Sequence, residues 1–434
     1  MLKYIGIFIV GILTSFYFFP IEFTFLRGVN TKMAMAGFGV IVLALQMARG
    51  MKAQMDKMLF SLSIIAMIVS LFALVAVTYN ETNDYTYATY IVSMWVWLSG
   101  AYIVVSCMRA WHGYVSVELV CKYLIGVCVA QCISALLIDS FPSYKNLVDT
   151  YVSGFGFVDV SKIEKVKRLY GIGAGLDVAG LRFSAVLVAI AYLCNRVVGR
   201  HKSMHMILYL LAFIFIGLVG NMIARTTTVG IILALVYWLL GSVALDKAHK
   251  CENRQIWKSL AIVLILTLPI IVWQYYSNMD SRMNIRFAFE GFFSLAEKGE
   301  WDVSSNRILI NMIKFPNSLK TWLIGDGYIE NPRIDPYYTG KIYPGFYMDT
   351  DIGYLRFIFY FGVFGLLSFI YFFVACTRAC IERLGEHKWL FLIILAVNLT
   401  GWLKVSTDIF LVFALFLCIP PEEKEKHVTY RAKQ

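Results

Sequence analysis

Charged side chains are scarce in this sequence, and their scarcity excludes a soluble globular protein. Lysine, arginine, aspartate and glutamate make up 15% of the 434 residues, whereas about 25% is usual for a soluble domain. Hydrophobic residues make up 59% of the chain. The composition therefore indicates an integral membrane protein that crosses the bilayer many times.

The sequence also lacks the motifs that mark many nucleotide- and metal-dependent proteins. No GxGxxG, Walker A or HExxH pattern occurs. Cys376 and Cys380 lie one helical turn apart, but no histidine or further cysteine pair accompanies them, so a metal site is not expected. All nine cysteines fall in predicted spans or inner segments, and no disulfide framework is implied. We expect neither a cofactor nor a metal.

Twelve apolar runs have about the length that a helix needs to cross the hydrocarbon core, roughly 17 to 25 residues. We expect an all-α polytopic membrane protein whose residues 1–434 form a single transmembrane domain of about twelve helices. The first run should remain as a helix, because Phe18-Phe19-Pro20 offers no small-residue cleavage site. The predicted spans are 3–20, 33–48, 58–78, 88–106, 118–138, 181–195, 206–224, 227–245, 259–276, 352–375, 389–403 and 405–419.

The lysines and arginines of the short connections predict the orientation, because positive residues gather on the cytoplasmic side. With the N-terminus inside, the inner connections hold several times as many of them as the short outer connections. Both termini are therefore expected in the cytoplasm. This bias accounts for the net charge of +11, so no nucleic-acid partner is expected.

Two long segments, 139–180 and 277–351, fall on the outer side of this topology. The second lies between the ninth and tenth spans, is rich in aromatic residues and is expected to fold against the helices. Apolar residues recur at helical spacing over 285–295 and 307–315, which predicts two or three short interfacial helices there. Tyrosines such as Tyr328 are suited to stack on sugar rings, although they also anchor proteins at the headgroup level.

Three arginines stand at the predicted outer edges of apolar runs: Arg182, Arg225 and Arg356. A guanidinium at the edge of hydrocarbon is costly unless an anion or a watery cavity receives it, so such residues are candidates for a functional site. The planar guanidinium also matches phosphate oxygens in bidentate fashion. We therefore expect a site for a lipid-linked phosphate. For Arg182 and Arg225 the alternative is a helix-end side chain that reaches the headgroups.

Several stretches, taken in order, resemble the Wzy-type O-antigen polymerases of Gram-negative bacteria. The first is the glycine-rich run Arg168–Ser184, which leads from an outer loop into a helix. The second is Ala224–Thr228, which is similar to the Ser-Arg turn of the wider polymerase and ligase superfamily. The third comprises Gly325–Tyr328, then Asp349–Arg356 and the span ending in Gly362–Gly365. Together with the twelve-span outline, the resemblance covers most of the chain.

This resemblance implies a glycosyltransferase of the bacterial inner membrane with its active site on the periplasmic face. Such enzymes move a growing glycan from one undecaprenyl diphosphate carrier onto the next lipid-linked repeat unit, without a nucleotide sugar. The expected partners are the lipid-linked oligosaccharide donor and acceptor, the lipid bilayer and a chain-length regulator. An O-antigen ligase remains an alternative, and so does a polytopic transporter or flippase of lipid-linked oligosaccharide, although the two large outer loops argue against the symmetry of a transporter.

Within this resemblance, Arg182 and Arg225 match the positions expected to hold the diphosphate. Arg356 either joins them or forms a structural ion pair with Asp349 or Asp351. Since all six histidines lie on the predicted inner side, the base that activates the acceptor hydroxyl should be a carboxylate.

Asp351 and Asp349 are the catalytic candidates, with a helix N-cap as the alternative for Asp351. The substrate-binding candidates are Arg168, Asp177, Arg286, Arg307 and Tyr328. Near the last span, Lys404 and Asp408 are expected to pair across one helical turn.

Overall fold

The structure is a computed structural model that describes residues 2–48, 57–155, 158–159, 168–198, 203–244, 247–332 and 345–420. Each of the twelve predicted apolar runs contains a helix. These helices are α1 (Leu2–Phe18), α2 (Thr31–Ala48), α3 (Lys57–Tyr79), α4 (Tyr90–His112), α5 (Val117–Ser140), α8 (Leu176–Val198), α9 (Ser203–Ile223), α10 (Thr227–Ala244), α11 (Lys247–Ser277), α16 (Gly353–Arg383), α17 (Lys388–Gly401) and α18 (Phe410–Leu417).

Eight helices of the described residues are long and apolar enough to cross a membrane, and the apolar parts of α1 and α10 are somewhat shorter. The chain is therefore a helical, multi-pass membrane protein, as its composition predicts. The last two helices are short, with 14 residues in α17 and 8 in α18. Every residue of α18 is buried. Most of the apolar stretch of α8 is buried as well, whereas α11 is largely exposed, so α8 and α18 belong to the core of the bundle and α11 to its periphery.

The predicted span 405–419 is helical only from Phe410, because polar side chains hold the preceding segment in an irregular conformation. Asn398 Oδ1 accepts a hydrogen bond from the Ile409 amide at 3.0 Å, and Trp402 Nε1 donates to the Thr407 carbonyl at 2.8 Å. These bonds satisfy backbone groups that a continuous helix would otherwise have paired.

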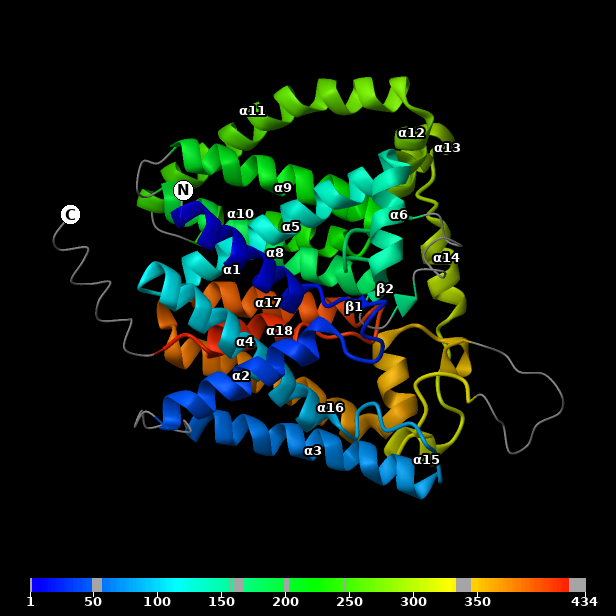
Figure 1. The fold of residues 1–434 in the computed structure, drawn as a ribbon. Helices are drawn as coiled ribbons and strands as arrows, with labels where there is room; N and C mark the ends of the chain where they lie inside the picture. Colours follow the sequence, from blue (N-terminus) through cyan, green and yellow to red (C-terminus); the bar gives the residue numbers. More distant parts are fainter. Residues whose placement is uncertain are drawn as a thin grey trace.

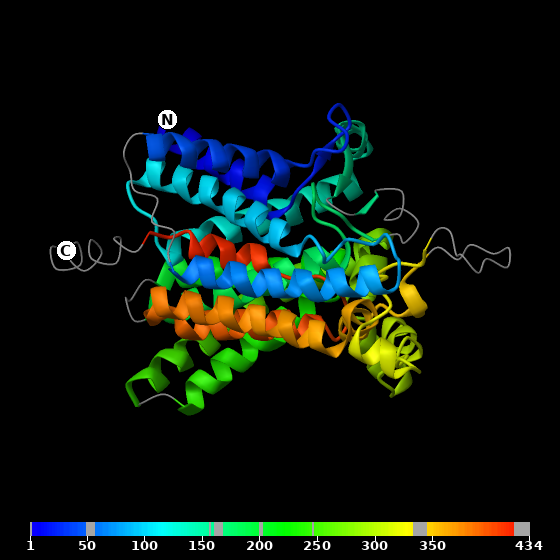
Figure 2. The ribbon, with the colours of Figure 1, turned by 90° about the horizontal axis from the view of Figure 1, so that it is seen from below.

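The long helices run side by side, and the shorter elements gather at one end of the bundle (Figures 1 and 2). The first residues of α1 and the last described residues after α18 lie at the opposite end (Figure 2). We call the end of the bundle where the shorter elements gather the loop end. It carries the helices α6 (Pro142–Tyr151), α12 (Met279–Ala288), α13 (Glu290–Lys298), α14 (Ser304–Asn311) and α15 (Leu319–Leu323), and the strands β1 (Glu22–Phe23), β2 (Val152–Phe155) and β3 (Val158–Asp159).

The segment between α11 and α16 contains short helices, as predicted, but its described residues form four of them, α12 to α15, where two or three were predicted, and the boundaries differ. The predicted helix 285–295 is interrupted at Phe289, which separates α12 from α13. In place of the predicted helix 307–315 the structure has α14, which begins and ends earlier in the chain. Neither α6 nor the antiparallel sheet, in the order β1-β2-β3, was expected from the sequence. The pairing of β1 with β2 joins strands that lie far apart in the chain, so no local pattern indicates it.

Helix α16 is broken at Phe361 and Gly362, where the backbone leaves the helical conformation. The break leaves the carbonyls of Phe359 and Tyr360 without their usual helical partners, and the amides of Asp326 and Gly327 donate to them instead. A loop from the large segment thus closes a gap inside a long apolar helix. Such breaks are tolerated at membrane depth only where other groups satisfy the backbone.

Replacing Gly362 with alanine should destabilise the protein. Gly362 has φ +70°, and a Cβ there would lie 2.3 Å from the Leu323 carbonyl oxygen. The left-handed conformation alone costs about 1–3 kcal/mol for a residue other than glycine. We expect Gly362→Ala to unfold several degrees below the wild type in a thermal melt in detergent. Gly126→Ala is the matched control, because Gly126 lies in α5 with no atom within 4 Å of its Cβ position; equal melting of both variants would contradict this account.

Candidate functional site

The start of α8 and the turn between α9 and α10 lie against each other at the loop end. Gly180 permits this approach, since a Cβ there would lie 1.9 Å from Thr226 Oγ1. Ser184, one turn further along α8, donates to the Thr226 carbonyl at 3.0 Å and accepts from the Gly230 amide at 3.1 Å. These contacts fix the turn that carries Arg225.

The guanidinium groups of Arg225 and Arg168 both contact one aromatic ring. Their guanidinium carbons are 4.3 and 5.1 Å from the ring centroid of Phe287 in α12. The Nε atom of each arginine is buried without a hydrogen-bond partner among the described residues. Two like charges this close, with donors to spare, are suited to bind an anion with several oxygens.

Glu290, at the start of α13, forms an ion pair with Arg225. It also accepts hydrogen bonds from the amide and the hydroxyl of Ser304, at 3.1 and 3.0 Å. Although burial opposes ionisation, the bonds from Ser304 and Arg225 lower the pKa of Glu290 below its ordinary value. An ionised carboxylate therefore occupies one side of Arg225.

Asp177 links this pair of arginines to the rest of the site. Its Oδ1 accepts from Lys404 Nζ at 3.0 Å and from Thr226 Oγ1 at 3.3 Å. Asp177 also lies within electrostatic range of Arg168 and of Asp351. Lys404 therefore pairs with Asp177, and the predicted pair with Asp408 is wrong. Asp408 instead accepts from the Phe410 amide at 2.9 Å.

Asp351 and Arg356 form the third part of the site. Their side chains are 3.2 Å apart, and Arg356 is 7% exposed. Arg356 also donates to the Ile329 carbonyl at 3.0 Å and lies over the Phe346 ring. The structural pair proposed for Arg356 is thus confirmed with Asp351. The capping alternative for Asp351 is wrong, because Ile352 is the N-cap of α16 and makes no side-chain capping bond.

Burial raises the pKa of Asp351 to about 7. Arg356 and Lys404 lower the pKa of this carboxyl, whereas the neighbouring Asp177 raises it, and burial outweighs the cations. A carboxyl whose pKa lies near neutrality can accept a proton and release it again at physiological pH, which is the property a general base requires. We refer to Arg168, Asp177, Arg225, Asp351, Arg356 and Lys404 together as the rim cluster.

Arg182 lies apart from the rim cluster, inside the bundle. It is 6% exposed and donates to the carbonyl of Phe18 at the end of α1. Its guanidinium also lies 5.9 Å from the Trp97 ring centroid, on which Lys32 approaches to 4.7 Å. The alternative in which Arg182 reaches the lipid headgroups is therefore wrong. The structure does not bring Arg182 into contact with Arg225.

Four other predicted site residues have local partners in the segment between α11 and α16. Asp349 is 76% exposed and pairs with Lys314 at 3.3 Å, Arg286 forms a bidentate pair with Glu297, and Arg307 is 69% exposed beside Asp302. Tyr328 contacts Tyr347 in a tilted arrangement, with ring centroids 5.5 Å apart. None of these contacts joins its residue to the rim cluster.

Phe287 and Glu290 were not predicted as site residues, and the pairing of Lys404 with Asp177 was not foreseen. Phe287 and Glu290 lie in a segment whose helical spacing was recognised, yet nothing in that spacing indicates which arginine they contact. Lys404 stands out as a charge within an apolar run, and this signal identifies the residue without identifying Asp177.

Among the described residues, no group of three His, Cys, Asp or Glu side chains is placed to hold a metal ion. The fold and the site together define a helical, multi-pass membrane protein with a largely half-buried cluster of ion pairs at its loop end. No protein-family model matches the sequence, and no curated protein or solved structure matches it either.

Proposed function

We propose that this protein is a glycosyltransferase of the O-antigen polymerase type, which transfers a growing glycan from an undecaprenyl diphosphate carrier onto the next lipid-linked repeat unit. The observation that carries the proposal is the rim cluster. It combines two adjacent arginines that have unused donors with a carboxyl whose pKa is about 7. These are the two kinds of group that transfer from a lipid diphosphate requires.

In this proposal Arg225 and Arg168 bind the diphosphate of the donor. Negative charge builds on the oxygen that links the sugar to phosphorus as their bond breaks, and arginines already fixed in place stabilise that charge. Both guanidiniums contact the Phe287 ring. Arg182, buried inside the bundle, is the third proposed cation for the donor.

Asp351 is the proposed base. Its carboxylate takes the proton from the acceptor hydroxyl, and the resulting oxygen attacks the anomeric carbon of the donor glycan. The new glycosidic bond forms while the anomeric carbon–oxygen bond to the diphosphate breaks, and undecaprenyl diphosphate leaves with the electron pair. Arg356 holds Asp351 in place at 3.2 Å. The activated sugar–diphosphate bond supplies the energy.

The proposal also assigns the orientation and the span count. The positive residues of the connections near the N-terminal end support placing that end in the cytoplasm, which puts the loop end and the rim cluster in the periplasm of a Gram-negative inner membrane. All twelve apolar helices would then lie in the bilayer region, and residues 277–351 would form the large periplasmic loop. Donor and acceptor would enter from the bilayer.

The experiment that tests the function is deletion of the gene in its native host, followed by gel display of the surface glycan. We expect the ladder of long chains to collapse to a single repeat unit attached to the lipid core. Loss of every attached glycan with polymer left on its carrier would indicate a ligase. Loss of all periplasmic repeats would indicate a flippase, and an unchanged ladder would contradict all three functions.

A further inference from the structure

The loop between α3 and α4 contacts the backbone of the large segment in a regular register. Asn80 Nδ2 donates to the Gly325 carbonyl at 3.1 Å and Thr82 Oγ1 donates to the Gly327 carbonyl at 3.0 Å. Asp84 Oδ2 accepts from the Ile329 amide at 2.9 Å. Every second residue of one loop thus binds every second residue of the other, with the same separation of 245 positions each time.

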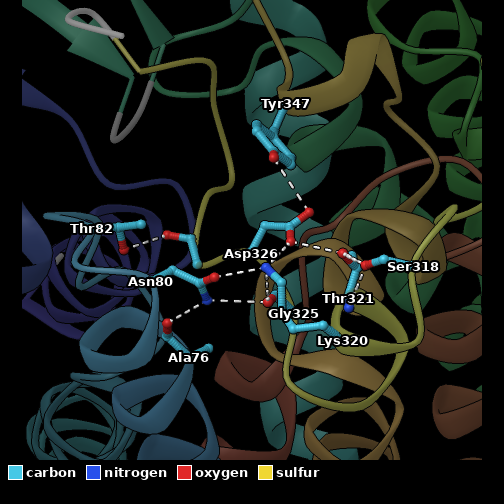
Figure 3. Close-up of polar contacts among 10 residues, drawn as sticks. Ala76, Asn80, Thr82, Ser318, Lys320, Thr321, Gly325, Asp326 and Tyr347 are labelled. Carbon is cyan, nitrogen blue, oxygen red and sulfur yellow. Dashed lines mark hydrogen bonds and ion pairs between the residues drawn. The ribbon is translucent and has the colours of Figure 1, made fainter. Parts of the chain in front are cut away.

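This register recognises backbone atoms, so it determines where the segment 325–329 lies. Figure 3 shows Asn80 and Thr82 on one side of Gly325 and Asp326, and Ser318 and Thr321 on the other. Asp326 accepts from Lys320 at 2.6 Å and from Thr321 at 2.8 Å. With polar partners on both sides, the segment is held against α3 and against the break in α16.

The same segment leads directly to the proposed base. The amide of Ile329 donates to Asp84. The carbonyl of the same residue accepts a hydrogen bond from Arg356 Nη2 at 3.0 Å. Arg356 Nη1 in turn contacts Asp351 Oδ1 at 3.2 Å. Asp84, Ile329, Arg356 and Asp351 therefore form a continuous chain of hydrogen bonds from the first loop to the rim cluster.

We infer that Asp84 is a positioning residue for the base: through the Ile329 backbone it sets the place of Arg356 and so keeps that guanidinium against Asp351. The inference rests on the proposed function, because it assumes that Asp351 is the base. Asp84 itself contacts none of the reacting groups. Its effect on catalysis is exerted through the position of one arginine.

The physical consequence is a change in the acidity of Asp351. The groups that face this carboxyl are Arg356 on α16, Asp177 on α8 and Lys404 after α17. Arg356 lowers the pKa of Asp351, so a displacement of Arg356 away from Asp351 raises this pKa. A purely structural role for Asp84 would lower stability and leave this pKa where it is.

The test compares Asp84→Ala with Asp84→Asn. Both remove the charge of Asp84, but asparagine keeps an oxygen that accepts from the Ile329 amide. In the alanine variant we expect the acidic limb of the pH–rate profile to move up by about one unit, which lowers the rate at pH 7 roughly fivefold. The asparagine variant should keep the wild-type profile. Equal profiles in the two variants would overturn the inference.

Infrared titration of the carboxyl provides a readout that needs no turnover. The band of Asp351 is identified in each background by subtracting the spectrum of Asp351→Asn, and its titration midpoint should rise in Asp84→Ala and stay in Asp84→Asn. If the protein transfers no glycan, the proposed function fails while this measurement still decides whether the chain of hydrogen bonds exists. If the titration midpoint of Asp351 is the same in Asp84→Ala as in the wild type, the inference about Asp84 is wrong, while the proposed function is unaffected.

Two further variants control for folding. Thr86→Val removes a hydroxyl that donates to Asp84 at 2.6 Å without touching Ile329, and it should leave the titration midpoint unchanged. If Asp84→Ala is not recovered folded, Thr82→Val removes the neighbouring bond of the register and should raise the midpoint by a smaller amount. An unchanged midpoint in Thr82→Val would then contradict the inference.

Discussion

Arg225→Ala should leave the protein in the membrane and reduce polymerisation roughly 100- to 1,000-fold, the loss observed when one preorganised donor to a developing charge is removed. In the native host, the long glycan ladder should collapse to a single capped repeat. Arg225→Lys should be intermediate, because lysine keeps the charge but lacks the planar fork that matches phosphate oxygens. Gel display of the surface glycan and rates with a lipid-linked repeat unit measure both effects.

A structural explanation for the same loss is that Arg225 merely holds Glu290 and with it α13. Glu290→Gln separates the two explanations. Glutamine keeps an oxygen for the Ser304 amide, which Glu290 binds at 3.1 Å, but it loses the ion pair with Arg225. If Arg225 serves the diphosphate, this variant should polymerise at least as well as the wild type. If Glu290→Gln is as inactive as Arg225→Ala, the diphosphate assignment of Arg225 is wrong.

The helical framework was predictable because hydrocarbon imposes one dominant constraint on sequence. An apolar run must satisfy its own backbone hydrogen bonds, and the helix does so locally. Each of the twelve predicted apolar runs therefore contains a helix. The break in α16 was not predictable in this way. It depends on amides from Asp326 and Gly327, which lie far earlier in the chain.

In the candidate site, too, local features of the sequence were predictable and contacts between distant residues were not. Arg225, Arg356 and Asp351 were recognised because a charge beside an apolar run is costly and conspicuous in any sequence. Their partners were foreseen only where they are close in the chain, as for Asp351 and Arg356. The pairing of Lys404 was assigned wrongly because an i, i+4 pair presupposes a helix, and residues 402–409 are not helical. Asp177, its partner, lies on α8.

Asp351→Asn should abolish most of the activity while the protein stays folded. Removal of a general base costs roughly 100- to 10,000-fold, and asparagine keeps the shape of the side chain without its ability to take a proton. In the wild type, the rate should rise with pH through about 7, where the Asp351 carboxyl ionises. The residual rate of the variant should lack this rise. A variant with full activity would contradict the assignment of Asp351 as the base.

The stability of the same variant provides an independent argument. The folded-state pKa of Asp351, about 7, lies above the ordinary value of 3.8, so the folded protein favours the protonated form. This contribution to stability is complete below the unfolded-state pKa and is lost as the pH rises through the folded-state pKa. The melting temperature of the wild type relative to Asp351→Asn should therefore fall between about pH 4 and pH 7. A carboxyl kept for structure would give the opposite sign, because ionisation of Asp351 beside Arg356 would then stabilise the fold. A variant that loses activity and gains stability at neutral pH identifies Asp351 as a residue kept for chemistry.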